Sequence, residues 1–482
     1  MSRSRWLVCG LAVVLSLAFG LRTLLLIDAT GLWSDELYSV GKSFQPNPAL
    51  LLDMLRQDTH PPVYYGLLWV WGQVMGQTPV TLRLLSWLAY VAGGCVMVAQ
   101  TAALAHQQRV VRPIAMGAAL VMVFCSPYPV RFAIEGKSYA LLVLFVALAW
   151  WWRRSERLIP YGLSLGFAAL THFYGLFLFV AAALWDGWKR RRKLALTAAL
   201  AVLPSVGWIV YASAYLFSSR SGSWIAPPDF ALFEDSLARG LGLWPLPKLA
   251  VLLLCFWGLR RWGGLQRRAG MRWGDLVLLD RSGLIASSLM VLAVVLVSFV
   301  KPLAFSRYFV VLLPAFVPWL AVQIASFKLV GPARWLAAAV LLVLVGTWWG
   351  PGFAELDPGS SLGREQDQFA EVSRLTSGET ERYSPRARLF NLSDQMELVM
   401  GRITTPPAAW TPTEQLPERL NQSHPPDQLW LASSGPQPAL NRRLDDWRQL
   451  VEQQHYRCED VSKQLSHAMV LRCRSGSKGH VP

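Results

Sequence analysis

Long apolar runs recur from Trp6 to about Gly350, and they constrain the fold more than any other feature of this chain. Each run approaches the roughly 20 residues that an α-helix needs to cross a bilayer. The chain is 53% hydrophobic and 16% charged, whereas a soluble domain carries about 25% charged residues. We therefore expect a polytopic α-helical membrane protein, with about 11 transmembrane helices in residues 1–350.

The character of the sequence changes at Pro351, where it becomes polar and rich in Pro and Gln. Residues 428–432 and 467–473 have the pattern of strands, and residues 442–453 that of an amphipathic helix. Residues 351–482 therefore predict a small C-terminal soluble α/β domain outside the cytoplasm. Cys458 and Cys473 flank the last predicted hairpin, and an oxidising compartment favours a disulfide between them.

The formal net charge of +16 invites a nucleic-acid interpretation, but the location of the basic residues argues against it. They gather in short loops between apolar runs, at 109–112, 153–157, 189–193, 260–281 and 328–334. Cytoplasmic loops of membrane proteins carry such an excess of Lys and Arg. We infer a multi-pass protein of the cell inner (plasma) membrane, with membrane lipids and not nucleic acid as its surroundings.

This charge pattern also sets the topology. Residues 28–78 become the first external loop, and the C-terminus lies outside. Residues 158–185 lie between two basic loops, so the chain must cross the membrane an even number of times there. As one helix these residues measure only about 42 Å, which is too short for two full crossings. They predict a hairpin of two short helices that turns near Thr171–Tyr174. Every unusual polar cluster near a helix end then falls on the external face, which predicts one external site.

The acidic pair Asp35-Glu36 follows the first apolar run. Acidic residues favour the first turn of a helix, so a structural role is one interpretation. The functional interpretation is catalytic, because a partly dehydrated carboxylate can accept the proton of an attacking hydroxyl. Asp58 and His60, just before Pro61-Pro62, are either a loop pair or ligands of a divalent cation or a phosphate.

Arg131, Glu135 and Lys137 precede the predicted helix near residues 137–152. Arg131 and Glu135 have the spacing of a helical ion pair, and that interpretation stands beside a role in substrate binding. His172 is either a satisfied core histidine or a site residue.

Arg307 and Tyr308 begin an apolar run, where a cation opposes the helix dipole. A lipid phosphate bound there would gain from the backbone N–H groups and from Arg307 together. Contact with bulk anionic head groups is the alternative.

Five motifs occur here in order: Asp-Glu after the first helix, His-Pro-Pro-x-Tyr-Tyr, Arg-x-x-x-Glu-x-Lys-x-Tyr, Thr-His in the hairpin, and Pro-x-x-x-x-Arg-Tyr. Together they resemble the bacterial membrane glycosyltransferases of the GT-C superfamily, in the branch of the protein-O-mannosyltransferases and aminoarabinose transferases. The resemblance covers residues 6–350. It implies an inverting transferase that takes a sugar from a polyprenyl-phosphate donor, without a nucleotide sugar, and passes it to a lipid, glycan or protein acceptor.

By position, the resemblance makes Asp35 the catalytic base, with Glu36 beside it. It makes Arg131, Lys137 and Arg307 a clamp for the donor phosphate, which Tyr308 helps to position. His60 falls where relatives place a residue that contacts phosphate or metal. Some relatives carry Glu-Lys where this chain has Thr59-His60, so the use of a divalent metal stays open.

A second class of protein fits the same cations, namely a transporter or flippase of lipid-linked sugars. Transporters place charged sites near the membrane midplane on broken helices, often within repeats. In this chain the charges gather at one face and no repeat is evident, which favours an enzyme.

Overall fold

The computed structural model describes residues 3–218, 225–234, 236, 247–267, 275–352, 368–435 and 437–476. The chain divides into two compact units, which we call the membrane unit and the sheet unit. The membrane unit comprises Met1–Leu25, Gln45–Val70 and Arg83–Phe353. The sheet unit comprises Leu26–Phe44, Trp71–Leu82 and Ala354–Pro482.

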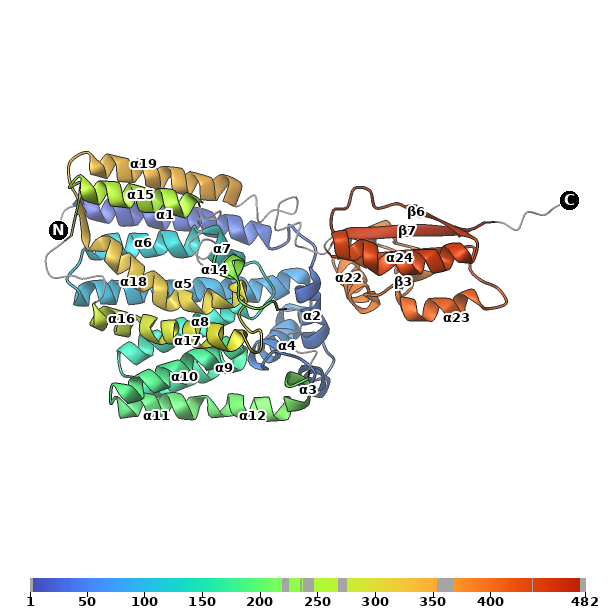
Figure 1. The fold of residues 1–482 in the computed structure, drawn as a ribbon, viewed down its shortest axis with the longest axis horizontal. Helices are drawn as coiled ribbons and strands as arrows, with labels where there is room; N and C mark the ends of the chain where they lie inside the picture. Colours follow the sequence, from blue (N-terminus) through green and yellow to red (C-terminus); the bar gives the residue numbers. More distant parts are fainter. Residues whose placement is uncertain are drawn as a thin grey trace. The chain divides into compact units, whose positions relative to one another are not determined.

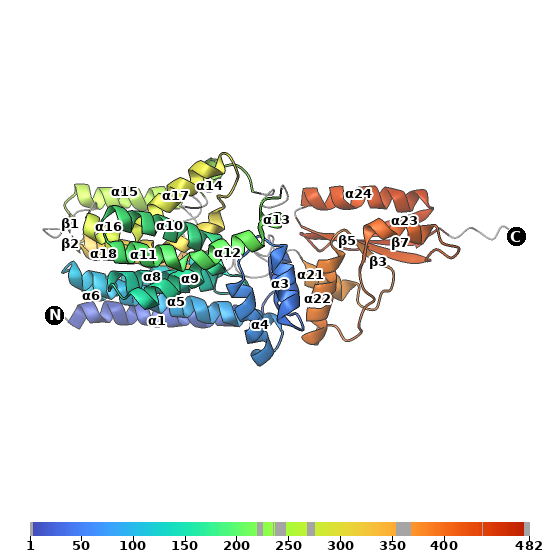
Figure 2. The same ribbon diagram turned by 90° about the horizontal axis from the view of Figure 1, so that it is seen from below.

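The membrane unit is helical, and its long helices run nearly parallel to one another (Figures 1 and 2). Its elements are α1 (Arg3–Leu26), α3 (Pro48–Arg56), α4 (Val63–Met75), α5 (Pro79–Gln107), α6 (Arg112–Phe124), α7 (Pro127–Arg131), α8 (Tyr139–Arg154), α9 (Leu158–Thr171), α10 (Phe173–Trp188), α11 (Arg192–Ala201), α12 (Leu203–Tyr211), α13 (Ser213–Leu216), α14 (Phe230–Glu234), α15 (Pro247–Arg261), α16 (Leu276–Ser282), α17 (Leu284–Ser298), the 3₁₀ segment η2 (Ser306–Leu312), α18 (Leu313–Ala325), α19 (Ala333–Thr347) and η3 (Trp348–Gly352). A short antiparallel ribbon pairs β1 (Leu265–Arg267) with β2 (Phe327–Leu329).

Five helical stretches in the described part of the chain are long and apolar enough to cross a membrane. They are Trp6–Leu26, Pro79–Gln107, Arg192–Tyr211, Ser306–Ala325 and Ala333–Gly350. The pair α16 and α17, bent by 74°, would make a sixth span, and α6, α9 and α10 are shorter apolar helices. The protein is therefore a polytopic helical membrane protein, and the count of about 11 crossings stays a prediction.

The bend between α16 and α17 lies at Gly283, whose φ of +89° is a left-handed conformation. A Cβ atom at this position would lie 2.5 Å from the ring of Trp150. Glycine meets both demands, because it has no side chain and reaches positive φ without strain.

A buried ionic network ties α8, α10 and α16 together near this bend. Arg153 lies 2.6 Å from Asp186 and 3.1 Å from Asp280, and Arg191 lies 2.7 Å from each of the two aspartates. The sequence indicates loop cations here, but the structure buries Arg153 in ion pairs. Removal of one partner would leave a buried charge uncompensated, so the network fixes how these helices pack.

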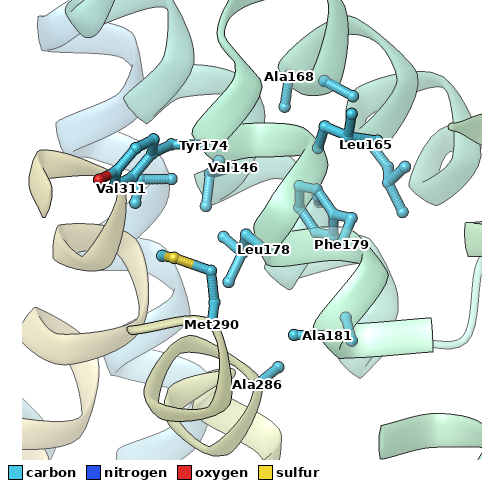
Figure 3. Packing of buried hydrophobic residues seen from close by; sticks show 14 of the residues in the cluster. Val146, Leu165, Ala168, Tyr174, Leu178, Phe179, Ala181, Ala286, Met290 and Val311 are labelled. Atoms are coloured by element: carbon cyan, nitrogen blue, oxygen red, sulfur yellow. The ribbon is translucent and has the colours of Figure 1, made fainter. Parts of the chain in front are cut away.

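The predicted short hairpin is present as α9 and α10, which meet at His172. Its inner face packs on α8, α17 and η2 through aliphatic and aromatic side chains. Figure 3 shows Leu178 of α10 facing Val146 of α8 and Met290 of α17, and Phe179 beside Leu165 of α9. This core packs α8, α9, α10 and η2 together, and the start of α8, the junction of α9 and α10, and η2 carry part of the candidate site.

The sheet unit is built on five strands in the order β4-β3-β5-β7-β6. Its elements are α2 (Ser34–Ser43), α21 (Phe369–Leu375), β3 (Arg382–Ser384), α22 (Ala387–Val399), β4 (Thr411–Pro412), η4 (Thr413–Gln415), α23 (Leu416–Leu420), β5 (Gln428–Ser434), α24 (Gln437–Gln453), β6 (Tyr456–Asp460) and β7 (Ala468–Ser475). β3 is parallel to β4 and β5, whereas β7 is antiparallel to β5 and β6. The predicted C-terminal α/β domain therefore exists.

One face of this sheet is covered by α24, which lies along β5 and β7 (Figure 2). Leu429 and Leu431 of β5 pack there with Leu444 and Val451 of α24. The predicted disulfide between Cys458 and Cys473 joins β6 to β7 within the same core.

Candidate functional site

Four aromatic rings from four separate parts of the chain meet in the membrane unit. His60 precedes α4, Tyr139 begins α8, His172 joins α9 to α10, and Tyr308 lies in η2. The centroid of the His172 ring lies 6.0 Å from that of His60, 5.9 Å from Tyr139 and 4.9 Å from Tyr308. We call these four residues the ring cluster. It brings together three predicted site residues: His60, His172 and Tyr308.

His172 has a structural role as well as a place in the ring cluster. Its Nδ1 accepts a hydrogen bond of 3.1 Å from the backbone N–H of Tyr174 and so caps the start of α10. A neutral imidazole that accepts through Nδ1 carries its proton on Nε2. The side chain is only 5% exposed. His172 is thus a buried histidine with a satisfied Nδ1, as the first of its two interpretations expects, and the same ring contacts the other members of the cluster.

The loop before η2 is held from two sides by tyrosine hydroxyls. Tyr174 donates a hydrogen bond of 2.9 Å to the carbonyl of Leu303, and Tyr128 donates one of 3.2 Å to the carbonyl of Ser306. The Tyr174 ring also lies 5.2 Å from that of Tyr308. These contacts position η2 relative to the hairpin, because a buried phenol gains most where its O–H finds an acceptor.

The turn that carries His60 is built from its own neighbours. The Nδ1 atom of His60 lies 3.4 Å from a carboxylate oxygen of Asp58 and 3.1 Å from the hydroxyl of Thr59. Tyr65, fully buried in the first turns of α4, contacts the imidazole edge-on at 6.0 Å between centroids. The predicted loop pair is therefore present, and it aims His60 at His172.

Arg131 and Glu135 form the predicted ion pair, with 2.5 Å between Nε and Oε1. The pair does not lie within one helix, because α7 ends at Arg131. Lys137 follows and is only 4% exposed, with its carbonyl accepting a hydrogen bond of 3.3 Å from Ser86. Burial of an ammonium group costs free energy unless opposite charge or hydrogen bonds compensate it.

Arg307 lies in η2, and the regular helix α18 begins only at Leu313. The helical stretch Ser306–Ala325 thus begins beside Arg307, as the sequence predicts, and its first turns are the 3₁₀ segment η2. The guanidinium of Arg307 lies 4.8 Å from the centroid of the Phe305 ring. Such stacking favours Arg over Lys at this position.

The acidic pair belongs to the sheet unit. Asp35 and Glu36 lie in the first turn of α2, as the structural interpretation expects, with Asp35 half-buried and Glu36 fully buried. In this unit α2 packs on α22, and a Cβ atom at Gly41 would lie 2.9 Å from Leu392. The catalytic role of either carboxylate stays a prediction.

No group of three or more His, Cys, Asp and Glu side chains in the described residues is arranged to hold a metal ion. Asp58 and His60 supply two side chains near one another, and the use of a divalent metal stays a prediction.

Two residues of this region, Tyr139 and Tyr174, are absent from the site predicted from the sequence. Both are buried, and both lie within 6 Å of His172 between ring centroids. Each follows a predicted ionisable residue by two positions, and Tyr139 also ends the Arg-x-x-x-Glu-x-Lys-x-Tyr motif.

The chain has the fold of the GT-C membrane glycosyltransferases. The comparison rests on ArnT from Cupriavidus metallidurans in the apo state, which is 13% identical, with a TM-score of 0.57 over 95% of this chain and 97% of that one. The same protein bound to undecaprenyl phosphate is 14% identical, with a TM-score of 0.55 and the same coverage. No protein-family model and no curated protein matches the chain.

Proposed function

We propose that this protein is a membrane glycosyltransferase that moves a sugar from a polyprenyl-phosphate donor to a lipid, glycan or protein acceptor. The observation that carries the proposal is the likeness to ArnT over 95% of the chain, because one of those structures holds undecaprenyl phosphate. The reaction takes place on the extracytoplasmic face of the inner membrane and inverts the anomeric centre. The basic loops support this orientation.

In the proposed reaction the acceptor hydroxyl attacks the anomeric carbon while the bond from that carbon to the donor phosphate breaks. The hydroxyl proton passes to Asp35, and polyprenyl phosphate leaves. Glu36 lies beside Asp35 in the first turn of α2. One carboxylate suffices because the phosphate is already a good leaving group, whereas retaining glycosidases need two.

The departing phosphate needs positive charge close to it. Lys137, Arg131 and Arg307 supply this charge. Fixed cations in a water-poor site stabilise the developing anion strongly. Support comes from the burial of Lys137 and from Tyr308, the neighbour of Arg307, in the ring cluster. His60 and His172 offer hydrogen bonds to the same phosphate or to the sugar. No step depends on a metal.

Replacement of Asp35 tests the proposal. We expect Asp35→Asn to lower turnover by roughly 10²–10⁴-fold, since it keeps the shape of the side chain and removes the base. Turnover is measured as polyprenyl phosphate released from a sugar-linked donor by the purified protein in nanodiscs. Asp53→Asn is the matched control, because Asp53 is an exposed residue of α3 in the same predicted external loop. Equal turnover for the two variants would make the carboxylate of Asp35 structural.

A further inference from the structure

The helix that carries the acidic pair is held by the sheet unit. α2 is amphipathic, and the residues that it buries include Leu37, Val40 and Gly41. In this unit α2 packs on α22, so closely that a Cβ atom at Gly41 would lie 2.9 Å from Leu392. Asp35 lies in the first turn of the same helix. Its position therefore depends on how α22 holds α2.

The segment before α2 is fixed by a close approach to α21. A Cβ atom added to Gly31 would lie 2.5 Å from the Cβ atom of Ala370, whereas ordinary van der Waals contact begins at 3.4 Å. The φ of Gly31 is outside the left-handed range. The contact, and not the backbone angle, therefore requires glycine here, because any other residue would push the segment and α21 about 1 Å apart.

Arg402 fastens the start of the same segment. It follows Gly401, whose φ of +66° lets the chain turn at the end of α22. The Nη2 atom of Arg402 lies 2.5 Å from Oδ1 of Asp28 and also donates a hydrogen bond of 3.3 Å to the carbonyl of Asp28. One guanidinium group thus holds both the side chain and the backbone of this residue.

A buried carboxylate orients Arg402 from the other side. Oε1 of Glu397 in α22 lies 3.4 Å from Nη1 of Arg402, and Oε2 lies 3.6 Å from Nε of Arg374 in α21. Glu397 is only 2% exposed, and a buried carboxylate is stable only where opposite charge compensates it. These ion pairs join α21, α22 and the segment before α2 into one support.

We infer that Arg402, Glu397 and the contact of Gly31 with Ala370 position α2, so that the sheet unit determines where the carboxylate of Asp35 lies. This role rests on the proposed function, in which Asp35 is the base. Reaction rates depend steeply on such placement, because an error of 1 Å can cost about 10²-fold. The alternative is that the same contacts only stabilise the fold of the sheet unit.

Complementary substitutions at Gly31 and Ala370 test the inference in the full-length protein in nanodiscs. Gly31→Ala should lower kcat for release of polyprenyl phosphate by up to about 10²-fold, because the two Cβ atoms force the segment to shift. The KM for the donor should stay near that of the wild type, since Asp35 acts on the acceptor hydroxyl. The double variant Gly31→Ala/Ala370→Gly should recover most of the kcat. Gly20→Ala is the control, because a Cβ atom there meets nothing within 4 Å.

Variants of Arg402 test the ion pairs without adding an atom to the packed contact. Arg402→Gln should lower kcat about fivefold, the most that a partly exposed ion pair allows, and Arg402→Lys should retain part of the loss-free rate. Arg448→Gln is the matched control, because it breaks an exposed pair with Glu452 at 2.9 Å on α24 and should leave kcat unchanged. The unfolding temperature of each variant is measured in parallel.

The outcomes separate this positioning role from the proposed function. Wild-type kcat in Gly31→Ala and Arg402→Gln, with turnover lost in Asp35→Asn, would overturn the positioning role alone. A lower unfolding temperature with unchanged kcat would show that the contacts only stabilise the fold. A loss of kcat in Gly31→Ala that Ala370→Gly does not repair would also overturn the role. Full turnover in Asp35→Asn would overturn both proposals, because Asp35 would then not be the base.

Discussion

At the scale of residues, His172 combines a structural and a chemical role in one ring. One nitrogen caps α10, while the ring faces His60 and Tyr308. The sequence leaves a satisfied core histidine and a site residue as alternatives. In the structure the His172 ring both caps α10 and belongs to the ring cluster, so a substitution at this position must be chosen to separate the two roles.

We expect His172→Asn to keep the cap and remove the imidazole, whereas His172→Ala removes both. Loss of a cap costs about 1 kcal/mol. Unfolding temperature in detergent should therefore fall for Ala and stay near wild type for Asn, while transferase turnover should fall for both variants. If His172→Asn retained full turnover, the imidazole would serve only to cap α10.

Which site residues the sequence can predict depends on their chemistry. His60 and Tyr308 stand out because polar residues are rare beside membrane helices, and the structure brings them to the same histidine. Tyr139 ends one of the five motifs, but neither it nor Tyr174 was predicted as a site residue, since aromatic residues are common at helix ends in membrane proteins. The sequence could not predict that Asp35 belongs to the sheet unit, because this depends on the packing of α2 on α22.

At the scale of elements, the short hairpin was predictable from the placement of charge and from length. Two basic loops required an even number of crossings, and residues 158–185 are too few for two full spans. The bend between α16 and α17 was not predictable, because one glycine in an apolar run rarely breaks a helix. Its cause is tertiary: Trp150 of α8 occupies the space that a side chain at Gly283 would need.

Substitution of this glycine should therefore be costly. We expect Gly283→Ala to destabilise the protein by about 1–2 kcal/mol from the left-handed backbone alone, and by more from the clash with Trp150. Thermal unfolding in detergent measures the effect. Gly207→Ala in α12 is the control, since a Cβ atom there meets nothing within 4 Å. Equal unfolding temperatures for both variants would contradict the account of the bend.

At the scale of the whole molecule, composition and charge placement were sufficient to predict a helical membrane protein followed by a small α/β domain. The order of five short motifs indicated the GT-C superfamily, and the fold agrees with ArnT at 13% identity. The identity of the sugar and the acceptor depends on side chains that pattern does not reveal.

The central claim is that the protein cleaves a lipid-linked sugar donor instead of moving it intact across the membrane. The most direct measurement uses sealed proteoliposomes and a polyprenyl-phosphate sugar labelled separately in its sugar and its phosphate. We predict that each sugar found on an acceptor is matched by one molecule of released polyprenyl phosphate, and that the new bond has the inverted configuration. Appearance of the intact donor in the opposite leaflet, with no cleavage, would contradict the claim and identify a flippase.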